Sequence, residues 1–144
     1  MSAQTEAPTH WLVKSEPDSW SWDQMVEAGE KGTMWNGVRN HLAKKQMMAM
    51  KLGDQAFFYH SNIGKEIVGI VEIIKLYYPD PTDASGRFGM VDVRAVKPLP
   101  QPISLAQVKA DPQFADLALV TNMRLSVQPV SAAHWQAICQ LGGL

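Results

Sequence analysis

The chain is organised around one stretch, Trp35-Asn36-Gly37-Val38-Arg39-Asn40, which leads into His41-Leu42-Ala43-Lys44-Lys45. Its tryptophan offers a stacking surface, Gly37 permits a sharp turn, and Arg39 can make bidentate contacts. Asn40 favours the start of a helix that continues to about Met50. This combination suits a site that stacks a planar ligand and hydrogen-bonds its edges. We therefore interpret the rest of the chain as the scaffold that positions this stretch.

The same region carries a local excess of positive charge. Residues 35–51 contain no acidic residue, but they contain Arg39, Lys44, Lys45 and Lys51. The whole chain, in contrast, has a formal net charge of -1. A helix N-terminus after Asn40 adds N–H donors and a positive dipole end, which suits a phosphate. Two interpretations stay open: an anion-binding surface, or a solvated lysine face, which is the usual meaning of such runs.

The composition is that of a soluble globular domain. A chain of 144 residues, with 46% hydrophobic and 19% charged residues, can bury the core of one domain. The single Cys139 excludes an internal disulfide and agrees with a reducing compartment. No apolar run reaches the ~20 residues of a membrane span. We predict a cytoplasmic monomer without membrane association, with a disordered tail over residues 1–9 and one domain over residues 10–144.

Hydrophobic periodicity predicts an α+β fold. Strands are expected over residues 10–14, 55–60, 66–78, 91–95 and, from a strict period of two, 121–130. Helices that follow a Ser or Asn cap are expected over residues 22–28, 41–50, 105–109 and 132–140. We expect one curled mixed or antiparallel sheet of about five or six strands, a pseudo-barrel with flanking short helices.

Glycine and proline refine this outline. Gly69, inside a long strand, predicts a bulge or a close approach of another group to the backbone. Pro98, Pro100 and Pro102 are expected to end the preceding strand before Ser104 caps the next helix.

Two further polar runs are candidates for a site. Tyr59-His60-Ser61-Asn62 lies where a buried strand meets a turn, so its side chains could read the edges of a ligand. A Tyr and His satisfied in the core, with Ser-Asn making the turn, is an equally open interpretation. Arg124 and Ser126 are expected to share one face of the strand over residues 121–130. The ordinary interpretation of that face is a polar, solvent-facing side.

Catalytic patterns are weak. Lys14-Ser15-Glu16 contains the groups of a lysine-activated serine, but strand alternation would point Ser15 away from the other two. The sequence has no G-x-S-x-G elbow, no metal-ligand spacing of His or Cys, and no glycine-rich phosphate loop. We predict a protein that is not an enzyme and uses no metal or other cofactor.

Five motifs in register resemble the EVE domain family over about residues 10–139. They are Trp11-Leu12-Val13-Lys14-Ser15-Glu16-Pro17, Trp35-Asn36-Gly37-Val38-Arg39-Asn40, Tyr59-His60-Ser61-Asn62, Asp80-Pro81-Thr82 and Arg124-Leu125-Ser126-Val127-Gln128-Pro129. The resemblance implies a PUA-like fold, related to the YTH and ASCH domains. It also implies a nucleic-acid-binding module whose pocket takes a modified base. That base would be a modified cytosine in DNA, such as 5-methylcytosine or 5-hydroxymethylcytosine, or a modified base in RNA.

On this resemblance, we expect base flipping into a pocket between the Trp35 stretch and the ends of two strands. The predicted base pocket consists of Lys14, Ser15, Glu16, Trp35, Val38, Asn40, Tyr59, His60, Ser61, Asn62, Leu125 and Ser126. The residues predicted to hold the nucleic-acid backbone are Arg39, Lys44, Lys45 and Arg124. Trp35 or Tyr59 would stack on the base, and Val38 and Leu125 would contact a methyl group.

Two departures from the family pattern leave the choice of base open. Lys44 stands where the family often has Arg, and Phe88 stands where Trp is common. Two other functions are alternatives. One is a small ASCH-like amidohydrolase that acts on modified nucleosides through Lys14, Ser15 and Glu16. The other is an interaction module that binds a small metabolite.

Overall fold

The computed structural model describes residues 9–144, so the tail predicted for residues 1–9 lies outside it except for Thr9. Among these residues, no helix has the length and apolar character to cross a membrane. The elements in chain order are β1 (His10–Ser15), α1 (Trp22–Ala28), η2 (Gly29–Lys31), β2 (Thr33–Met34), α2 (His41–Ala49), β3 (Gln55–His60), β4 (Glu66–Pro79), β5 (Gly89–Ser104), α3 (Leu105–Ala110), η3 (Pro112–Phe114), α4 (Ala118–Thr121), β6 (Val127–Val130) and α5 (Ala132–Leu141).

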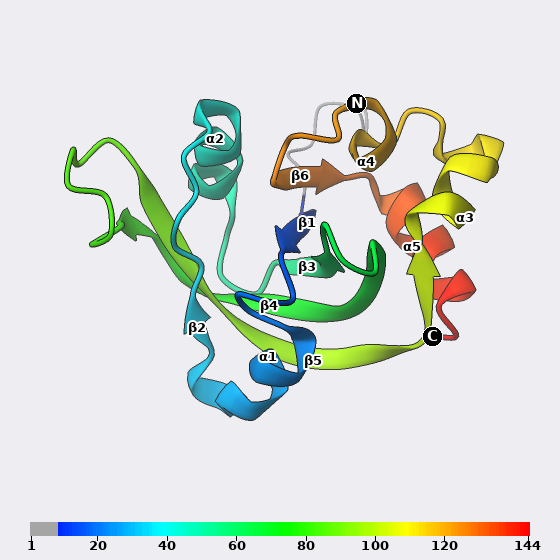
Figure 1. Cartoon of the computed structure of the whole chain (residues 1–144), viewed down its shortest axis with the longest axis horizontal. Helices are drawn as coiled ribbons and strands as arrows, with labels where there is room; N and C mark the ends of the chain where they lie inside the picture. Colours follow the sequence, from blue (N-terminus) through cyan, green and yellow to red (C-terminus); the bar gives the residue numbers. More distant parts are fainter. Residues whose placement is uncertain (1–8) are drawn as a thin grey trace, which may run out of the picture.

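The strands form one mixed, six-stranded sheet in the order β2-β5-β4-β3-β1-β6. β1 and β3 run parallel, and the other neighbouring pairs are antiparallel. Figure 1 shows that β4 and β5 are long and strongly curved. The sheet does not close, because β2 and β6 remain at its two ends. The predicted α+β class and curled mixed sheet are confirmed.

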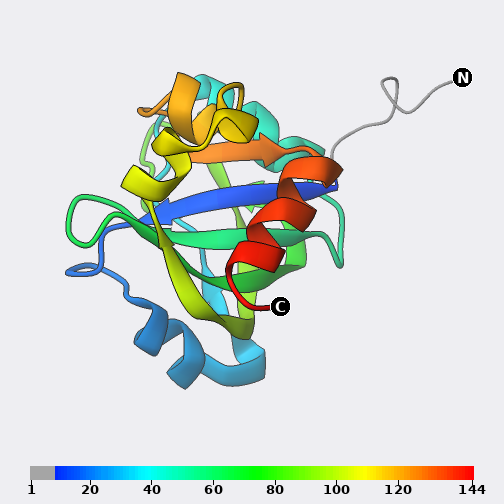
Figure 2. The same ribbon diagram turned by 90° about the vertical axis from the view of Figure 1, so that its right-hand side faces the viewer.

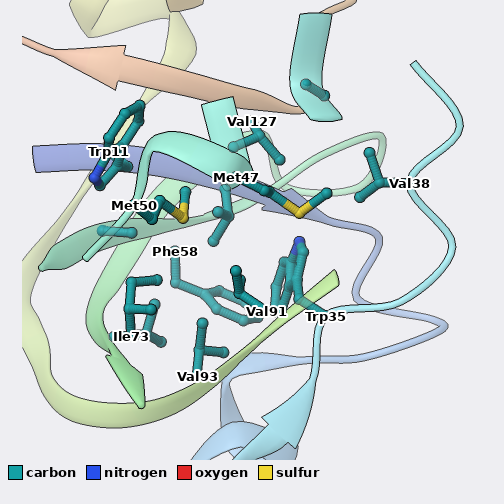
Figure 3. Packing of buried hydrophobic residues seen from close by; sticks show 14 of the residues in the cluster. Trp11, Trp35, Val38, Met47, Met50, Phe58, Ile73, Val91, Val93 and Val127 are labelled. Atoms are coloured by element: carbon teal, nitrogen blue, oxygen red, sulfur yellow. The ribbon is translucent and has the colours of Figure 1, made fainter. Parts of the chain in front are cut away.

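Both faces of the sheet are buried, and each face has its own core. On one face, Trp11 of β1 and Phe58 of β3 pack with residues of α1 and α2, such as Met25 and Met47; we call this the first core (Figure 3). On the opposite face, the neighbouring residues Leu12 and Phe57 belong to a second core with α3, η3, α4 and α5. Because side chains alternate along a strand, β1 and β3 need apolar residues at successive positions.

Helix α5 covers the second core. The ring of Trp135 stacks on Phe57 with 3.9 Å between ring centroids, and Ile138 is buried beside it. Figure 2 shows α5 lying across the sheet. The helix starts at Ser131, whose side chain accepts a hydrogen bond from the His134 N–H.

The other predicted helix starts are confirmed. Ser21 and Ser104 each form a capping box with a glutamine three residues later. The Asn40 side chain accepts a hydrogen bond from the Ala43 N–H and begins α2. These caps satisfy N–H groups that have no partner inside their helices.

The three prolines do not end β5, contrary to the prediction. The strand continues to Ser104, and its register against β4 skips from Pro98 to Ile103. On the other side, β2 pairs only with Asp92 and Val93, so the distal part of β5 lacks a neighbouring strand there. Proline is tolerated at such edges and bulges because no ladder hydrogen bond is lost.

The strand predicted over residues 121–130 is also wrong in its first half. Only Val127–Val130 forms β6, and residues 122–126 form a turn and loop. The side chain of Gln128 holds this turn, because its Nε2 donates to the carbonyls of Asn122, at 3.1 Å, and Leu125, at 3.0 Å. Gln128 is thereby buried rather than solvent-facing.

Gly69 shows both predicted features, a bulge and a close approach of another group to the backbone. The register of β3 against β4 shifts between Phe58 and Tyr59, which leaves Val68 as the extra residue of a bulge next to Gly69. A Cβ placed on Gly69 would lie 2.5 Å from the Trp22 ring. The glycine thus lets α1 approach the sheet.

We predict that Gly69→Ala lowers the free energy of unfolding by about 1–3 kcal/mol, because the added methyl overlaps the Trp22 ring. Urea denaturation measures this. In a Trp22→Leu background the ring is absent, so the same glycine substitution should cost much less. An equal cost in both backgrounds would contradict this explanation.

Candidate nucleic-acid interface

A cavity of about 800 Å³ lies beside the carboxyl end of β1. Its walls come from segments that are distant in the sequence. They are residues 14–16 at the end of β1, Ser19 and Trp20, residues 33–39 of β2 and the segment after it, Ser61 after β3, and the loop before β6 with Met123, Arg124 and Ser126. The Trp35 stretch therefore forms one wall.

The structure brings together a part of the predicted site. Seven of the twelve predicted base-pocket residues line the cavity: Lys14, Ser15, Glu16, Trp35, Val38, Ser61 and Ser126. Two of the residues predicted to hold the nucleic-acid backbone, Arg39 and Arg124, also line it. The others, Asn40, Tyr59, His60, Asn62, Leu125, Lys44 and Lys45, do not.

Three of the predicted residues that do not line the cavity pack in or beside the two cores. Tyr59 is buried in the second core, because it follows Phe58 in β3 and so points to the opposite face. Leu125 is buried in the first core. The His60 ring accepts a hydrogen bond from the Trp22 N–H at 3.1 Å, and burial lowers its pKa.

The polar and charged residues outside the cavity have local roles. Asn40 caps α2. The Asn62 amide lies 3.4 Å from Glu16 Oε1, in a turn where Asn62 has a φ of 69°. Lys44 Nζ donates to the Arg87 carbonyl at 2.5 Å, whereas Lys45 is exposed on α2. The predicted set therefore included residues that shape the turn and the helix around the cavity.

Lys14, Ser15 and Glu16 all line the cavity, although alternation predicted that Ser15 would point away. The difference arises because β1 ends at Ser15 and the chain turns after it. Lys14 Nζ donates to the Met123 carbonyl, and Ser15 Oγ donates to the Trp20 carbonyl at 2.5 Å. The two side chains are thus bound to different acceptors. Burial lowers the pKa of Lys14.

Two tryptophans contribute to the walls in different ways. Trp35 is only 7% exposed and packs edge to face against Phe58, with 5.6 Å between centroids, so it mainly belongs to the first core (Figure 3). Trp20 is half-buried, and its indole N–H points to Met25 Sδ at 3.1 Å. Trp20 was not among the residues predicted for the site. Its place in the sequence, a few residues after a strand that was expected to end at the site, could have indicated it.

A buried carboxylate holds the Trp35 stretch in place. Asp80 Oδ2 accepts hydrogen bonds from the Gly37 N–H at 2.8 Å and from the Arg39 guanidinium at 3.1 Å. Asp80 Oδ1 accepts from the Thr82 N–H at 2.7 Å and the Thr82 hydroxyl at 2.6 Å. Burial by itself raises the pKa of Asp80, but these hydrogen bonds outweigh it and lower the pKa to about 2.

The Arg39 guanidinium donates to groups of the protein and is also accessible to solvent. It also donates to the Thr82 hydroxyl at 3.0 Å, and its side chain remains 40% exposed at the cavity. Glycine at position 37 is required because its φ is 85°, in the left-handed region.

Within residues 9–144, no group of three or more His, Cys, Asp or Glu side chains could hold a metal ion.

Comparison with known proteins decides the family. The sequence model of the EVE domain family matches residues 9–141. The chain belongs to the EVE domain family. This EVE domain is 33% identical to thymocyte nuclear protein 1 of Homo sapiens, over 92% of this chain and 73% of that protein.

Solved structures of other proteins share its fold closely. A protein of Rhodopseudomonas palustris is 62% identical, with a TM-score of 0.88, over 93% of this chain and 92% of that one. The human THYN1 protein, in a complex with DNA that contains 5-methylcytosine, is 34% identical with a TM-score of 0.88. The match covers 94% of this chain and 98% of that one. An ASCH structure from Zymomonas mobilis, 11% identical with a TM-score of 0.56, shows a likeness of fold alone.

We predict that Asp80→Asn lowers the free energy of unfolding by about 2 kcal/mol or more at pH 7. A folded-state pKa lowered from 3.8 to about 2 in a side chain that is 0% exposed corresponds to about 2 kcal/mol. Because the folded-state pKa is depressed, this contribution is present above about pH 4. It is lost as the pH falls from about 4 to about 2.

The measurement is urea denaturation of both proteins between pH 7 and pH 2. The difference in stability between wild type and variant should shrink over the acidic range. Asp18→Asn, at an exposed position, serves as the control and should change stability little. A difference that stays constant down to pH 2 would contradict the assigned role of the Asp80 carboxylate.

Proposed function

We propose that this EVE domain recognises a modified base in nucleic acid, and that the base leaves its stack and enters the cavity. One observation carries the proposal: the chain has a cavity of about 800 Å³ and is 34% identical to the human THYN1 protein, which forms a complex with DNA containing 5-methylcytosine. Cavities of ~300–1,000 Å³ suit small ligands. DNA with a modified cytosine is thus the first ligand to test, and a modified RNA base is the second.

Aromatic and hydroxyl groups in the walls support this assignment. Trp20 and Trp35 both line the cavity, and the half-buried Trp20 is the better placed to stack on a base, which can stabilise a bound base by ~1–3 kcal/mol. Ser15, Ser61 and Ser126 line the same space. The Ser15 hydroxyl donates to the Trp20 carbonyl and can accept from a base edge, whereas the hydroxyls of Ser61 and Ser126 can donate or accept. Together they offer one surface for the face of a base and several groups for its edge.

Charge around the cavity supports contacts with the nucleic-acid backbone. Arg39 and Arg124 are exposed and line the cavity, so their guanidinium groups can reach phosphates beside a base that enters it. Lys14 adds a third basic group, which is half-buried and donates to the Met123 carbonyl. With a net charge of -1, the chain relies on this local positive field rather than on bulk charge.

Val38 is our candidate for contact with the methyl group of 5-methylcytosine. It is a buried aliphatic residue that still lines the cavity, whereas Leu125, the other predicted methyl sensor, does not. Apolar contact contributes about 0.8 kcal/mol per buried carbon group.

The cytoplasmic location and the monomeric state stay predictions.

We predict that the protein binds an oligonucleotide with one 5-methylcytosine more tightly than the unmodified oligonucleotide. Val38→Ala should reduce this preference about fourfold, with little change in affinity for the unmodified strand, because one apolar contact of about 0.8 kcal/mol is lost. Fluorescence anisotropy at a single salt concentration gives both affinities. Val96→Ala, at an exposed position of β5, is the matched control. Equal affinities of wild type for both oligonucleotides would contradict modified-cytosine recognition.

One observation favours the amidohydrolase as a second candidate. Lys14, Ser15 and Glu16 all face the cavity, which the alternation argument had not predicted. Against it, Lys14 and Ser15 donate to separate backbone carbonyls and not to each other. We therefore infer binding rather than catalysis.

If the domain were catalytic, it would release ammonia from modified nucleosides in a reaction abolished by Lys14→Ala. We expect no release above background from wild type, Lys14→Ala or the surface control Lys109→Ala. A coupled ammonia assay measures this. Release by wild type and the control, but not by Lys14→Ala, would establish the amidohydrolase instead.

A further inference from the structure

The rim of the cavity carries an exposed apolar side chain on a braced loop. Met123 is 48% exposed and lies in the turn that precedes β6. Of the large apolar side chains exposed within residues 9–144, only Met123 and Met34 also line the cavity. An exposed apolar side chain contributes no free energy of burial to folding. Its position beside the cavity therefore suggests that Met123 is buried by a bound ligand.

The backbone around Met123 is held from several sides. Lys14 Nζ donates to the carbonyl of Met123 itself. The buried Gln128 amide donates to the carbonyls of the residues on either side of the turn, Asn122 and Leu125. The Lys14 N–H donates to the Ser126 carbonyl at 3.0 Å. In Figure 1 this loop is the orange trace between α4 and β6. Because the backbone of this loop is already held, insertion of the Met123 side chain into a partner would cost little further backbone entropy.

Base flipping creates a need for such a side chain. When a base leaves a duplex, its neighbours lose their stacking partner, and the gap must be filled or collapse. Proteins that bend or open DNA insert apolar residues, methionine among them, between base steps. The inserting residue has to lie beside the pocket that receives the base. Met123 meets this requirement, and the adjacent Arg124, exposed at the same cavity, can contact the flanking phosphate.

Met34 is the weaker candidate for the same role. It belongs to β2, where its backbone pairs with Asp92 of β5. It has a comparable exposure, 46%, but it lies in a strand at the end of the sheet rather than in a turn.

We propose that Met123 inserts into the base stack of duplex DNA at the position vacated by the base that enters the cavity. This inference rests on the proposed function and deepens it, because it assigns the residue that stabilises the opened duplex. A single strand has no gap to fill, so Met123 should matter for duplex and not for single-stranded ligand.

The test compares two ligands of the same sequence, a duplex and a single strand, each with one 5-methylcytosine. Met123→Ala should weaken binding of the duplex about tenfold, a fraction of the few kcal/mol that unstacking costs, and change single-strand affinity less than twofold. Met123→Leu, which keeps a long apolar side chain, should retain most of the duplex affinity. Met48→Ala, at a methionine of α2 that is 57% exposed outside the cavity, is the matched control. Fluorescence anisotropy at one salt concentration measures all affinities.

A second readout locates the insertion. A 2-aminopurine placed next to the modified base should brighten when wild type binds the duplex and less so with Met123→Ala. Equal losses on duplex and single strand, or no loss on either, would overturn the proposal. The expected pattern in Met34→Ala, but not in Met123→Ala, would assign insertion to β2 and also overturn it.

Failure of the proposed function gives a different result. Wild type would then bind modified and unmodified duplexes equally, while the duplex-to-single-strand comparison of Met123→Ala would still decide the insertion. Absence of any duplex binding by wild type would overturn the insertion proposal and would leave a modified RNA base as the ligand to test for the proposed function.

Discussion

The cavity wall depends on the buried carboxylate of Asp80. Residues 35–40 form neither helix nor strand, so the sheet and helices alone do not fix their course. Asp80 accepts hydrogen bonds from the Gly37 N–H and the Arg39 guanidinium, and thereby ties this segment to the loop between β4 and β5. A charged group without water is costly unless it is fully hydrogen-bonded, so the carboxylate tolerates few other arrangements of its donors. The turn at Gly37 and the position of Val38 follow from that requirement.

The sheet supplies the rigid frame for this wall. β1 and β3 are buried on both faces, which fixes their register because a slip of one residue would exchange the two cores. The carboxyl end of β1 is therefore held firmly, and it presents residues 14–16 to the cavity. Lys14 then links this frame to the loop of Met123, so two segments that are distant in the sequence are coupled at one site. Such preorganisation lowers the entropy lost on binding.

Local rules predicted much of the fold, and contacts between distant residues explain the rest. The caps at Ser21, Asn40, Ser104 and Ser131 depend on side chains within a few residues, and all were predictable. The period of two over residues 121–130 was misleading, since the Gln128 side chain satisfies the loop carbonyls that a strand would have paired. Tyr59 was predicted for the pocket, but its side chain points to the face of the sheet that is covered by the second core, and it is buried there. The link from Asp80 to Gly37 spans 43 residues, so no local pattern could predict it.

In our proposal, the cavity walled by the Trp35 stretch receives one modified base. A crystal structure of this protein with a short duplex that contains a single 5-methylcytosine tests it most directly. We expect the modified base to lie outside the duplex, inside the cavity between Trp20, Val38 and the serine hydroxyls, with Arg39 and Arg124 near the backbone. A base that remains stacked in the duplex, or DNA bound to another face of the domain, would contradict it.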